Sequence, residues 1–189
     1  QYMCGERRYT IQMLQHYEVG FCIYTPKYPQ AAGRILFPIR RAGQLVGWQA
    51  RYCGKADWRV TPKYYGMPGL RKRLMLYNYD RAQNAPFVCV VEGPTDCHVV
   101  GDTCVAILGK SLSRYQADLL VSTWIAKPII MLLDPDAREE SLATVQDLRN
   151  IGVIVVDVVL PDDRDCGDYD KRTLWNIIYL QAERAGVIL

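Results

Sequence analysis

The second half of the sequence alternates between short apolar runs and more polar segments, and this alternation restricts the fold more than any other feature. Residues 87–91, 104–108, 128–133 and 153–160 form four runs that are apolar almost throughout. Strands that are apolar on both faces, with helices between them, are typical of parallel sheets covered on both sides. The expected fold class is therefore α/β, with a parallel four-stranded sheet flanked by helices.

Helix signals occupy the segments between and after these runs. Ser113 is a favourable N-cap residue for a helix over 113–121. Apolar residues recur with helical spacing over 137–150, and Gly152 follows as a terminator. A last helix is expected over 171–185, because its leucine and isoleucine residues would share one face.

The first half is less regular. Residues 34–39 and 45–51 predict two strands, joined by a tight turn over 41–44. Residues 61–76 contain two prolines and two glycines and are expected to be mostly loop. We therefore predict a small α+β subdomain ahead of the parallel sheet.

Charge divides the chain in the same place. The formal net charge is +3, but residues 1–85 hold 14 Lys and Arg against 4 Asp and Glu, whereas residues 86–189 hold 9 against 16. A basic half followed by an acidic half indicates one surface for phosphates and another for metal ions. Two solvated faces of uneven charge would give the same counts, so that alternative stays open at this point.

The spacing of the cysteines and the length of the apolar runs indicate the cellular compartment of the protein. The seven cysteines include no CxxC pair, so the spacing of a zinc ribbon is missing. Scattered thiols in an odd number are typical of a reducing environment. No run of about 18 apolar residues could span a membrane, and residues 6–8 are charged with no apolar core behind them. We therefore expect a cytoplasmic protein with no membrane span and no secretory signal.

Carboxylates follow the expected strands at the point where each strand ends. Glu92 comes directly after the first run, Asp134 and Asp136 follow the third, and further aspartates lie in residues 162–168. Open parallel sheets bind ligands at this edge, and gathered carboxylates favour Mg²⁺ or Mn²⁺. Taken singly, each has a simpler explanation: a turn for Asp-Pro-Asp, a helix N-terminal charge for Glu92 and a solvated acidic loop for 162–168.

Two of these acidic segments resemble known motifs. Residues 90–96, Val-Val-Glu-Gly-Pro-Thr-Asp, resemble the glutamate motif of TOPRIM domains, and residues 132–136, Leu-Leu-Asp-Pro-Asp, resemble their paired-aspartate motif. TOPRIM domains occur in bacterial-type primases, topoisomerases and certain nucleases. Residues 105–113 and the acidic stretch 160–165 resemble the corresponding segments of primases, in the same order and at similar spacing.

Blocks in the first half separate primases from other TOPRIM proteins. Residues 33–39 and 47–51 resemble the small basic subdomain that precedes TOPRIM in primases, and residues 62–64 and 76–82 match two further primase signatures. The resemblance covers residues 9–170, and it is to the RNA-polymerase core of bacterial-type, DnaG-like DNA primases.

This resemblance implies a domain organisation and an acidic site. It divides the chain into a basic N-terminal primase subdomain (1–85), a TOPRIM catalytic domain (86–168) and a C-terminal helix (169–189). The residues that match the family's catalytic centre and metal ligands are all carboxylates. They are Glu92, Asp134 and Asp136 as catalytic residues, and Glu92, Asp96, Asp134, Asp136 and Asp165 as ligands of Mg²⁺ or Mn²⁺.

The resemblance also implies contacts with nucleic acid and nucleotide. Guanidinium groups grip phosphates bidentately, lysines act as point charges, and tyrosines stack on bases. Any single basic residue here could equally be a solvated surface charge. The matching residues are Arg34, Arg51, Lys63, Tyr64, Lys72 and Lys110.

The implied activity is the synthesis of short RNA primers on a single-stranded DNA template, from NTPs and with two divalent ions. The implied partners are the template, the NTPs and a replicative helicase or another replisome protein, in a bacterial or phage-infected cell. A TOPRIM-type nuclease and a non-catalytic nucleic-acid-binding module stay as alternatives, although the basic block 33–51 disfavours a nuclease. The sequence contains neither a zinc ribbon nor a Walker A motif. We therefore expect a minimal, phage-type primase or one piece of a larger protein.

Overall fold

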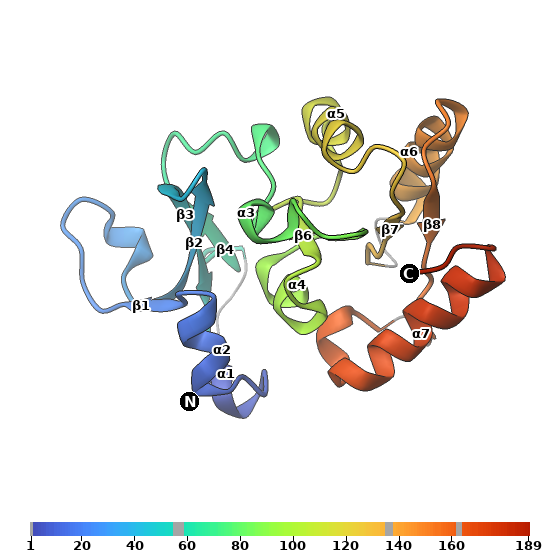
Figure 1. Ribbon diagram of the computed structural model, residues 1–189. Coiled ribbons are helices and arrows are strands. Elements are labelled where there is room, and N and C mark those ends of the chain that lie inside the picture. Colours follow the sequence, from blue (N-terminus) through green and yellow to red (C-terminus); the bar gives the residue numbers. More distant parts are fainter. Residues whose placement is uncertain (1, 55–58, 135–137, 162–163) are drawn as a thin grey trace. The chain divides into compact units, whose positions relative to one another are not determined.

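The chain forms two compact units, Gln1–Leu70 and Arg71–Leu189 (Figure 1). Each unit has a sheet of its own, and each is described by itself. No helix in the described parts of the chain is both long enough and apolar enough to cross a membrane. The computed structural model describes residues 2–54, 59–134, 138–161 and 164–189.

The second unit is built on a parallel sheet of four strands. These are β5 (Val88–Val91), β6 (Cys104–Ala106), β7 (Ile129–Met131) and β8 (Val155–Asp157), in the spatial order β6-β5-β7-β8. Every neighbouring pair is parallel. The α/β class and the parallel four-stranded sheet expected from the sequence are confirmed.

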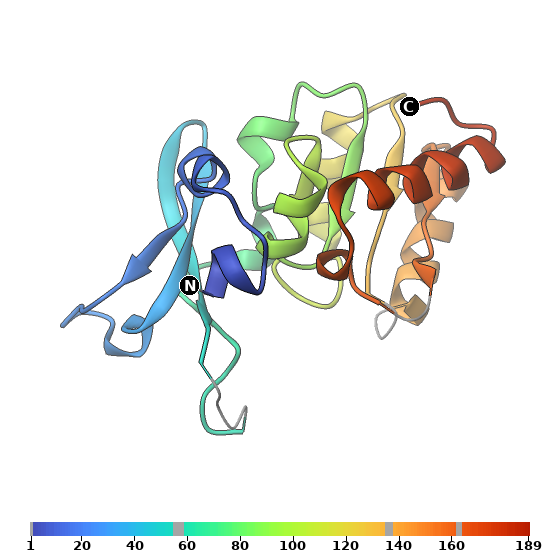
Figure 2. The same cartoon turned by 90° about the horizontal axis from the view of Figure 1, so that it is seen from below.

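Helices cover both faces of this sheet. Helices α5 (Arg114–Thr123) and α6 (Arg138–Asn150) lie on one side, and α4 (Pro94–Val100) and α7 (Lys171–Arg184) lie on the other. Figure 2 shows α4 and α7 in front of the strands in the turned view. Because both faces are covered, every residue of β5 is fully buried.

Local capping sets where these helices begin and end. The Ser113 hydroxyl accepts a hydrogen bond from Gln116 N at 3.1 Å, and the Gln116 side chain accepts one from Ser113 N at 2.9 Å, so α5 begins with a capping box. Asp170 caps α7 by accepting a hydrogen bond from Thr173 N at 3.0 Å. Gly152, with a φ of 84°, follows α6 and lets the chain turn back toward β8.

The core of this unit lies between the sheet, α5 and α6. Val90 and Ile129 of the strands pack with Leu120 and Trp124 of α5 and with Val145 of α6, and all five are buried. Fully burying a large apolar side chain stabilises the fold by about 1.5–3 kcal/mol. This core therefore gives the strand ends a rigid base.

The segment before β5 packs against the edge strand β6. Tyr77 N donates to Ala106 O at 2.9 Å, and Ala106 N donates to Tyr77 O at 3.2 Å. The side-chain amide of Asn78 donates to Cys104 O at 2.9 Å. Residues 71–85, which the sequence analysis assigned to the basic subdomain, thus pack with the parallel sheet. The functional domain boundaries stay a prediction.

The first unit contains an antiparallel sheet in the order β1-β2-β3-β4. Its long strands β2 (Arg34–Arg41) and β3 (Gln44–Tyr52) lie where two strands were predicted. The edge strands β1 (Gly20–Cys22) and β4 (Tyr64–Gly66) were not predicted, because three residues are too few to show a period of two.

Short helices precede this sheet and link other elements. Helices α1 (Tyr2–Gly5) and α2 (Ile11–His16) open the chain, and the Thr10 hydroxyl caps α2 by accepting a hydrogen bond from Met13 N at 3.1 Å. Further short turns are η1 (Pro29–Ala31), η2 (Lys72–Leu74), α3 (Tyr79–Ala82) and η5 (Cys166–Asp168).

A two-residue turn joins β2 to β3. Arg41 pairs with Gln44, and Ala42 and Gly43 between them have φ angles of 50° and 76°. Two successive left-handed residues form a type I′ turn, whose twist matches that of the flanking strands. Glycine adopts this conformation without steric cost, whereas residues with a Cβ are strained.

We expect Gly43→Ala to lower the free energy of unfolding of the first unit by about 1–2 kcal/mol, because a Cβ is strained at this φ. Gly20→Ala is the matched control. Its added Cβ would lie 3.9 Å from Leu36 Cβ, an ordinary contact, so the change should stay within about 1 kcal/mol. Urea denaturation measures both variants, and equal losses would show that the turn conformation does not limit stability.

Candidate active site at the carboxyl edge of the parallel sheet

Strands β5 and β7 end at the same edge of the sheet and bring Glu92 and Asp134 to it. Val90 pairs with Met131, and Leu132 N donates to Val90 O at 2.9 Å, so the parallel register continues to the strand ends. Glu92 follows β5 directly, and Asp134 comes shortly after β7. The parallel pairing therefore places both carboxylates where open α/β sheets bind ligands.

Backbone contacts hold Glu92 in the turn between β5 and α4. Its carbonyl accepts a hydrogen bond from Leu108 N at 2.9 Å, which ties it to the end of β6. Its Oε1 atom is buried. Gly93 then caps α4 in an extended conformation, and Pro94 begins the helix. As a result, Asp96 lies in the first turn of α4 with 9% of its surface exposed.

The thiol of Cys166 lies near three of the predicted carboxylates. Cys166 is 1% exposed, and burial raises the pKa of its thiol well above the usual range. The nearby carboxylates of Asp96, Asp134 and Asp165 raise this pKa further. The structure thus brings together aspartates from α4, from the segment after β7 and from the turn before η5.

These carboxylates have the donor chemistry of a Mg²⁺ or Mn²⁺ site. Oδ1 of Asp165 is buried and accepts no hydrogen bond from any residue that the structure describes. A buried carboxylate oxygen of this kind is costly unless a donor or a cation satisfies it. Within the same residues, no three His, Cys, Asp or Glu side chains are spaced to hold a metal ion as they stand. Asp136 lies outside the described residues.

Arg34 is buried in the first unit and bonds to the backbone of two loops. It is 4% exposed, and it donates from Nε to Gln30 O at 2.8 Å and from Nη1 to Pro62 O at 2.7 Å. Its guanidinium lies 5.3 Å from the centre of the Tyr52 ring. These contacts hold the loops that precede β2 and β4. Its predicted role in binding phosphate stays a prediction.

Arg51 is held in a similar way by two tyrosines. It is 5% exposed, and it donates to Tyr2 Oη at 3.0 Å and to Tyr64 Oη at 2.6 Å. Both rings also flank the guanidinium, with centres 5.7 Å and 5.2 Å away. The Tyr64 ring, predicted to stack on bases, is half-buried and packs on this arginine.

The three predicted lysines are exposed. Lys63 precedes β4 in the first unit. In the second unit, Lys72 lies in η2 and Lys110 follows β6. Exposed ammonium groups suit contact with phosphates, so the lysines fit the predicted role more simply than the two buried arginines do.

Two residues near the acidic edge carried no sequence prediction. Cys166 lies among the aspartates, and Gln116 uses its side chain to join α5 to other segments. The available signals were weak. A cysteine within an acidic stretch has no fixed meaning, and a glutamine three residues after an N-cap serine indicates only a capping box.

Comparison with known proteins adds two sequence relatives. No family model matches the chain. The DNA primase of Synechococcus elongatus is 31% identical over 163 residues, and that of Staphylococcus epidermidis is 29% identical over 154 residues. The alignments cover 77% and 74% of this chain but 23% and 25% of those primases. The chain therefore spans about a quarter of the length of the curated relatives it matches.

Solved structures with this fold are catalytic parts of primases. The RNA polymerase domain of Mycobacterium tuberculosis primase DnaG has a TM-score of 0.75 at 20% identity, with 96% of this chain and 77% of that chain covered. A DnaG catalytic domain bound to single-stranded DNA has a TM-score of 0.76 at 19% identity, with 96% and 69% covered. The chain has the fold of the DnaG-like primase cores. A phage origin stays a prediction.

With this DnaG-like fold, we expect Arg34→Met to lower the free energy of unfolding by about 1–3 kcal/mol, because the buried guanidinium is lost together with its hydrogen bonds to the carbonyls of Gln30 and Pro62. Lys63→Met is the control, since Lys63 is exposed and such a change usually stays within about 0.5 kcal/mol. Urea unfolding followed by circular dichroism measures both. Unchanged stability in Arg34→Met would show that its bonds to the loops are not structural.

The buried thiols of this DnaG-like core are expected to resist alkylation. Burial raises the pKa of Cys89 and of Cys104, and the neighbouring Cys97 raises both further, so the reactive thiolate is scarce. At pH 8, iodoacetamide should modify the exposed Cys4 first and reach Cys89 and Cys104 only after unfolding. Peptide mass spectrometry follows each site, and equal rates for Cys104 and Cys4 would contradict this.

The same pKa shifts give stability a pH dependence. The folded-state pKa of these thiols lies above the unfolded value. Their contribution to the free energy of unfolding is therefore fully present below about pH 8.5 and is lost as the pH rises.

Proposed function

We propose that the chain is the catalytic core of a DNA primase, which synthesises short RNA primers on a single-stranded DNA template. The observation that carries this proposal is the parallel pairing of β5 and β7, which places Glu92 and Asp134 at one sheet edge, with Asp96 and Asp165 also near the buried Cys166 thiol. The DnaG-like fold around this edge supports the same conclusion.

Two Mg²⁺ or Mn²⁺ ions are the cofactors proposed for this edge. Asp134 and Asp165 would hold them together with Glu92, Asp96 and the neighbouring Asp136. Ions bound there would orient the attacking hydroxyl and neutralise charge on the triphosphate. The donors that these residues offer are carboxylate oxygens, which suit such hard ions.

Glu92 is proposed as a ligand or as a proton acceptor. Its backbone is tied to the end of β6 through Leu108, and its Oε1 atom is buried. A carboxylate held in this way keeps its place without reorganising during the reaction. From there it serves as a metal ligand or accepts the proton of the attacking hydroxyl.

Cations are proposed to bind the phosphates of both substrates. In the second unit, Lys72 and Lys110 are assigned to the triphosphate of the incoming NTP. Residues 1–70 hold 10 Lys and Arg against 3 Asp and Glu, a balance that favours a polyanion such as the template. Within them, Arg34 and Arg51 support the loops that carry Lys63 and Tyr64.

The template and a partner protein are proposed from the relatives. A DnaG catalytic domain with this fold has been solved with single-stranded DNA, which supports such a template for this chain. A replicative helicase or another replisome protein is proposed as a partner on the resemblance to primases alone.

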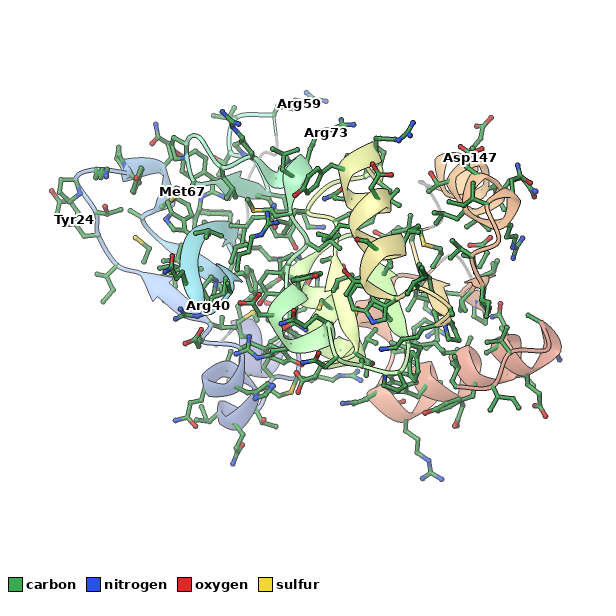
Figure 3. The ribbon with its side chains drawn as sticks, turned by 45° about the horizontal axis from the view of Figure 1, so that its top comes forward. Tyr24, Arg40, Arg59, Met67, Arg73 and Asp147 are labelled. Carbon is green, nitrogen blue, oxygen red and sulfur yellow. The ribbon has the colours of Figure 1, made fainter. Side chains whose placement is uncertain are left out.

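We expect Asp134→Asn to lower primer synthesis at least about a hundredfold, because losing a charged ligand removes several kcal/mol of transition-state stabilisation. Asp147→Asn is the matched control, since Asp147 is an exposed carboxylate on α6 (Figure 3). Labelled NTPs, random single-stranded DNA and Mg²⁺ or Mn²⁺ provide the assay. Primers made by Asp134→Asn at the wild-type rate would refute the site, and DNA cleavage without NTPs would favour a nuclease.

A further inference from the structure

The side-chain amide of Gln116 joins three segments of the second unit. Gln116 is 1% exposed. Its Nε2 atom donates to Lys72 O at 3.1 Å, to Met75 O at 2.8 Å and to Ile107 O at 2.9 Å. An amide has two protons for these three carbonyls, so one proton is shared. The amide therefore acts as a junction between α5, the segment around η2 and the end of β6.

These contacts go beyond what the capping box of α5 requires. The box uses Oε1 of Gln116, which accepts a hydrogen bond from Ser113 N at 2.9 Å, and a glutamate serves this position as well as a glutamine. The Nε2 atom is a separate donor that glutamate lacks. Ser113 adds a second tie, because its hydroxyl donates to Arg73 O at 2.5 Å.

Through Ile107 the same amide is linked to the acidic edge. Ile107 N donates to Val91 O at 3.0 Å, and Leu108 N donates to Glu92 O at 2.9 Å. One buried amide thus connects η2 to the strand end that carries Glu92. A shift of η2 away from this edge would leave a buried hydrogen-bonding group unsatisfied, which is costly.

The segment held in this way carries three consecutive cations. Arg71, Lys72 and Arg73 are all exposed, and Arg73 is labelled in Figure 3. Their side chains face solvent while their backbone is bound by Gln116 and Ser113. Cations on a fixed backbone lose less freedom when they bind an anion, and this favours affinity.

We propose that Gln116 is a positioning residue, which fixes the Arg71–Arg73 cations relative to the acidic edge and so sets the affinity for the triphosphate of the incoming nucleotide. This inference rests on the proposed primase function and adds a residue that no primase motif in the sequence pointed to. If the segment lost its hydrogen bonds to Gln116, it would keep its charges but would no longer hold them in a fixed position. Binding of the triphosphate depends on that position. The carboxylates would stay where they are, so the Mg²⁺ dependence should not change.

Gln116→Glu separates the two roles of this side chain. The variant keeps the shape and the acceptor for Ser113 N, but it turns a donor into an acceptor that faces three carbonyls. Gln146→Glu is the matched control, because Gln146 is exposed on α6 and its amide donates to Asn150 in the same helix at 2.9 Å.

Hydrogen exchange in the full chain tests the position of the segment. We expect Gln116→Glu to speed amide exchange in residues 71–76 about tenfold while the β5 peptides stay unchanged, and Gln146→Glu to change neither. Unchanged exchange in residues 71–76 would overturn the inference. If Gln116→Glu fails to fold, Ser113→Ala compared with Ser113→Thr, which keeps the hydroxyl, applies the same test to the second tie.

Nucleotide affinity separates this inference from the proposed function. Calorimetric titration with ATP and Mg²⁺ needs no primer synthesis, and we expect about tenfold weaker binding for Gln116→Glu. In the primer assay, KM for NTPs should rise by a similar factor, with kcat and the half-saturating Mg²⁺ concentration within about twofold of wild type.

If the wild type made no primers, the result would count against the proposed function. The comparison of ATP affinity between the wild type and Gln116→Glu would still test the inference. Wild-type affinity for ATP in Gln116→Glu, or no ATP binding by the wild type, would overturn the inference itself.

Discussion

The pairing of β5 with a strand on each side is the constraint on which the rest of the second unit depends. β5 holds β6 through one edge and β7 through the other, and the turns that leave all three strands face the same way because the sheet is parallel. Glu92, Asp134 and the carbonyl of Ile107 all stand on these strand ends. Their spacing is therefore set by the sheet. The side-chain amide of Gln116 on α5 then links the end of β6 to η2.

Burial explains which parts of the fold could be predicted from the sequence. The parallel strands are covered on both faces, so their apolar runs stand out, and Ser113 marks the start of α5 through a local hydrogen bond. The short strands β1 and β4 carry no such pattern, since their pairing depends on distant partners in β2 and β3. The segment 71–76, expected to be loop, contains η2, whose position is set by α5.

The candidate site was predictable in its acidic part and less so in its basic part. Carboxylates that follow strands meet wherever the strands meet, and Asp96, Asp134 and Asp165 do lie around one thiol; their roles, with that of Asp136, stay predictions. Arg34 and Arg51 matched binding positions by motif, yet both are buried on loop carbonyls and tyrosines. A motif records which residue is present, whereas its partners depend on the tertiary structure.

The strand order also determines how late the acidic edge can form. β5 pairs with β6 after a short connection through α4, whereas its pairing with β7 must wait for α5 and the chain beyond it. Loop closure over a longer stretch of chain costs more entropy and slows folding. During synthesis from the N-terminus, β5 and β6 thus leave the ribosome before the strand that leads to Asp134. Repulsion between the carboxylates of Glu92 and Asp134 can therefore oppose the pairing of β7 but not the earlier pairing of β5 with β6.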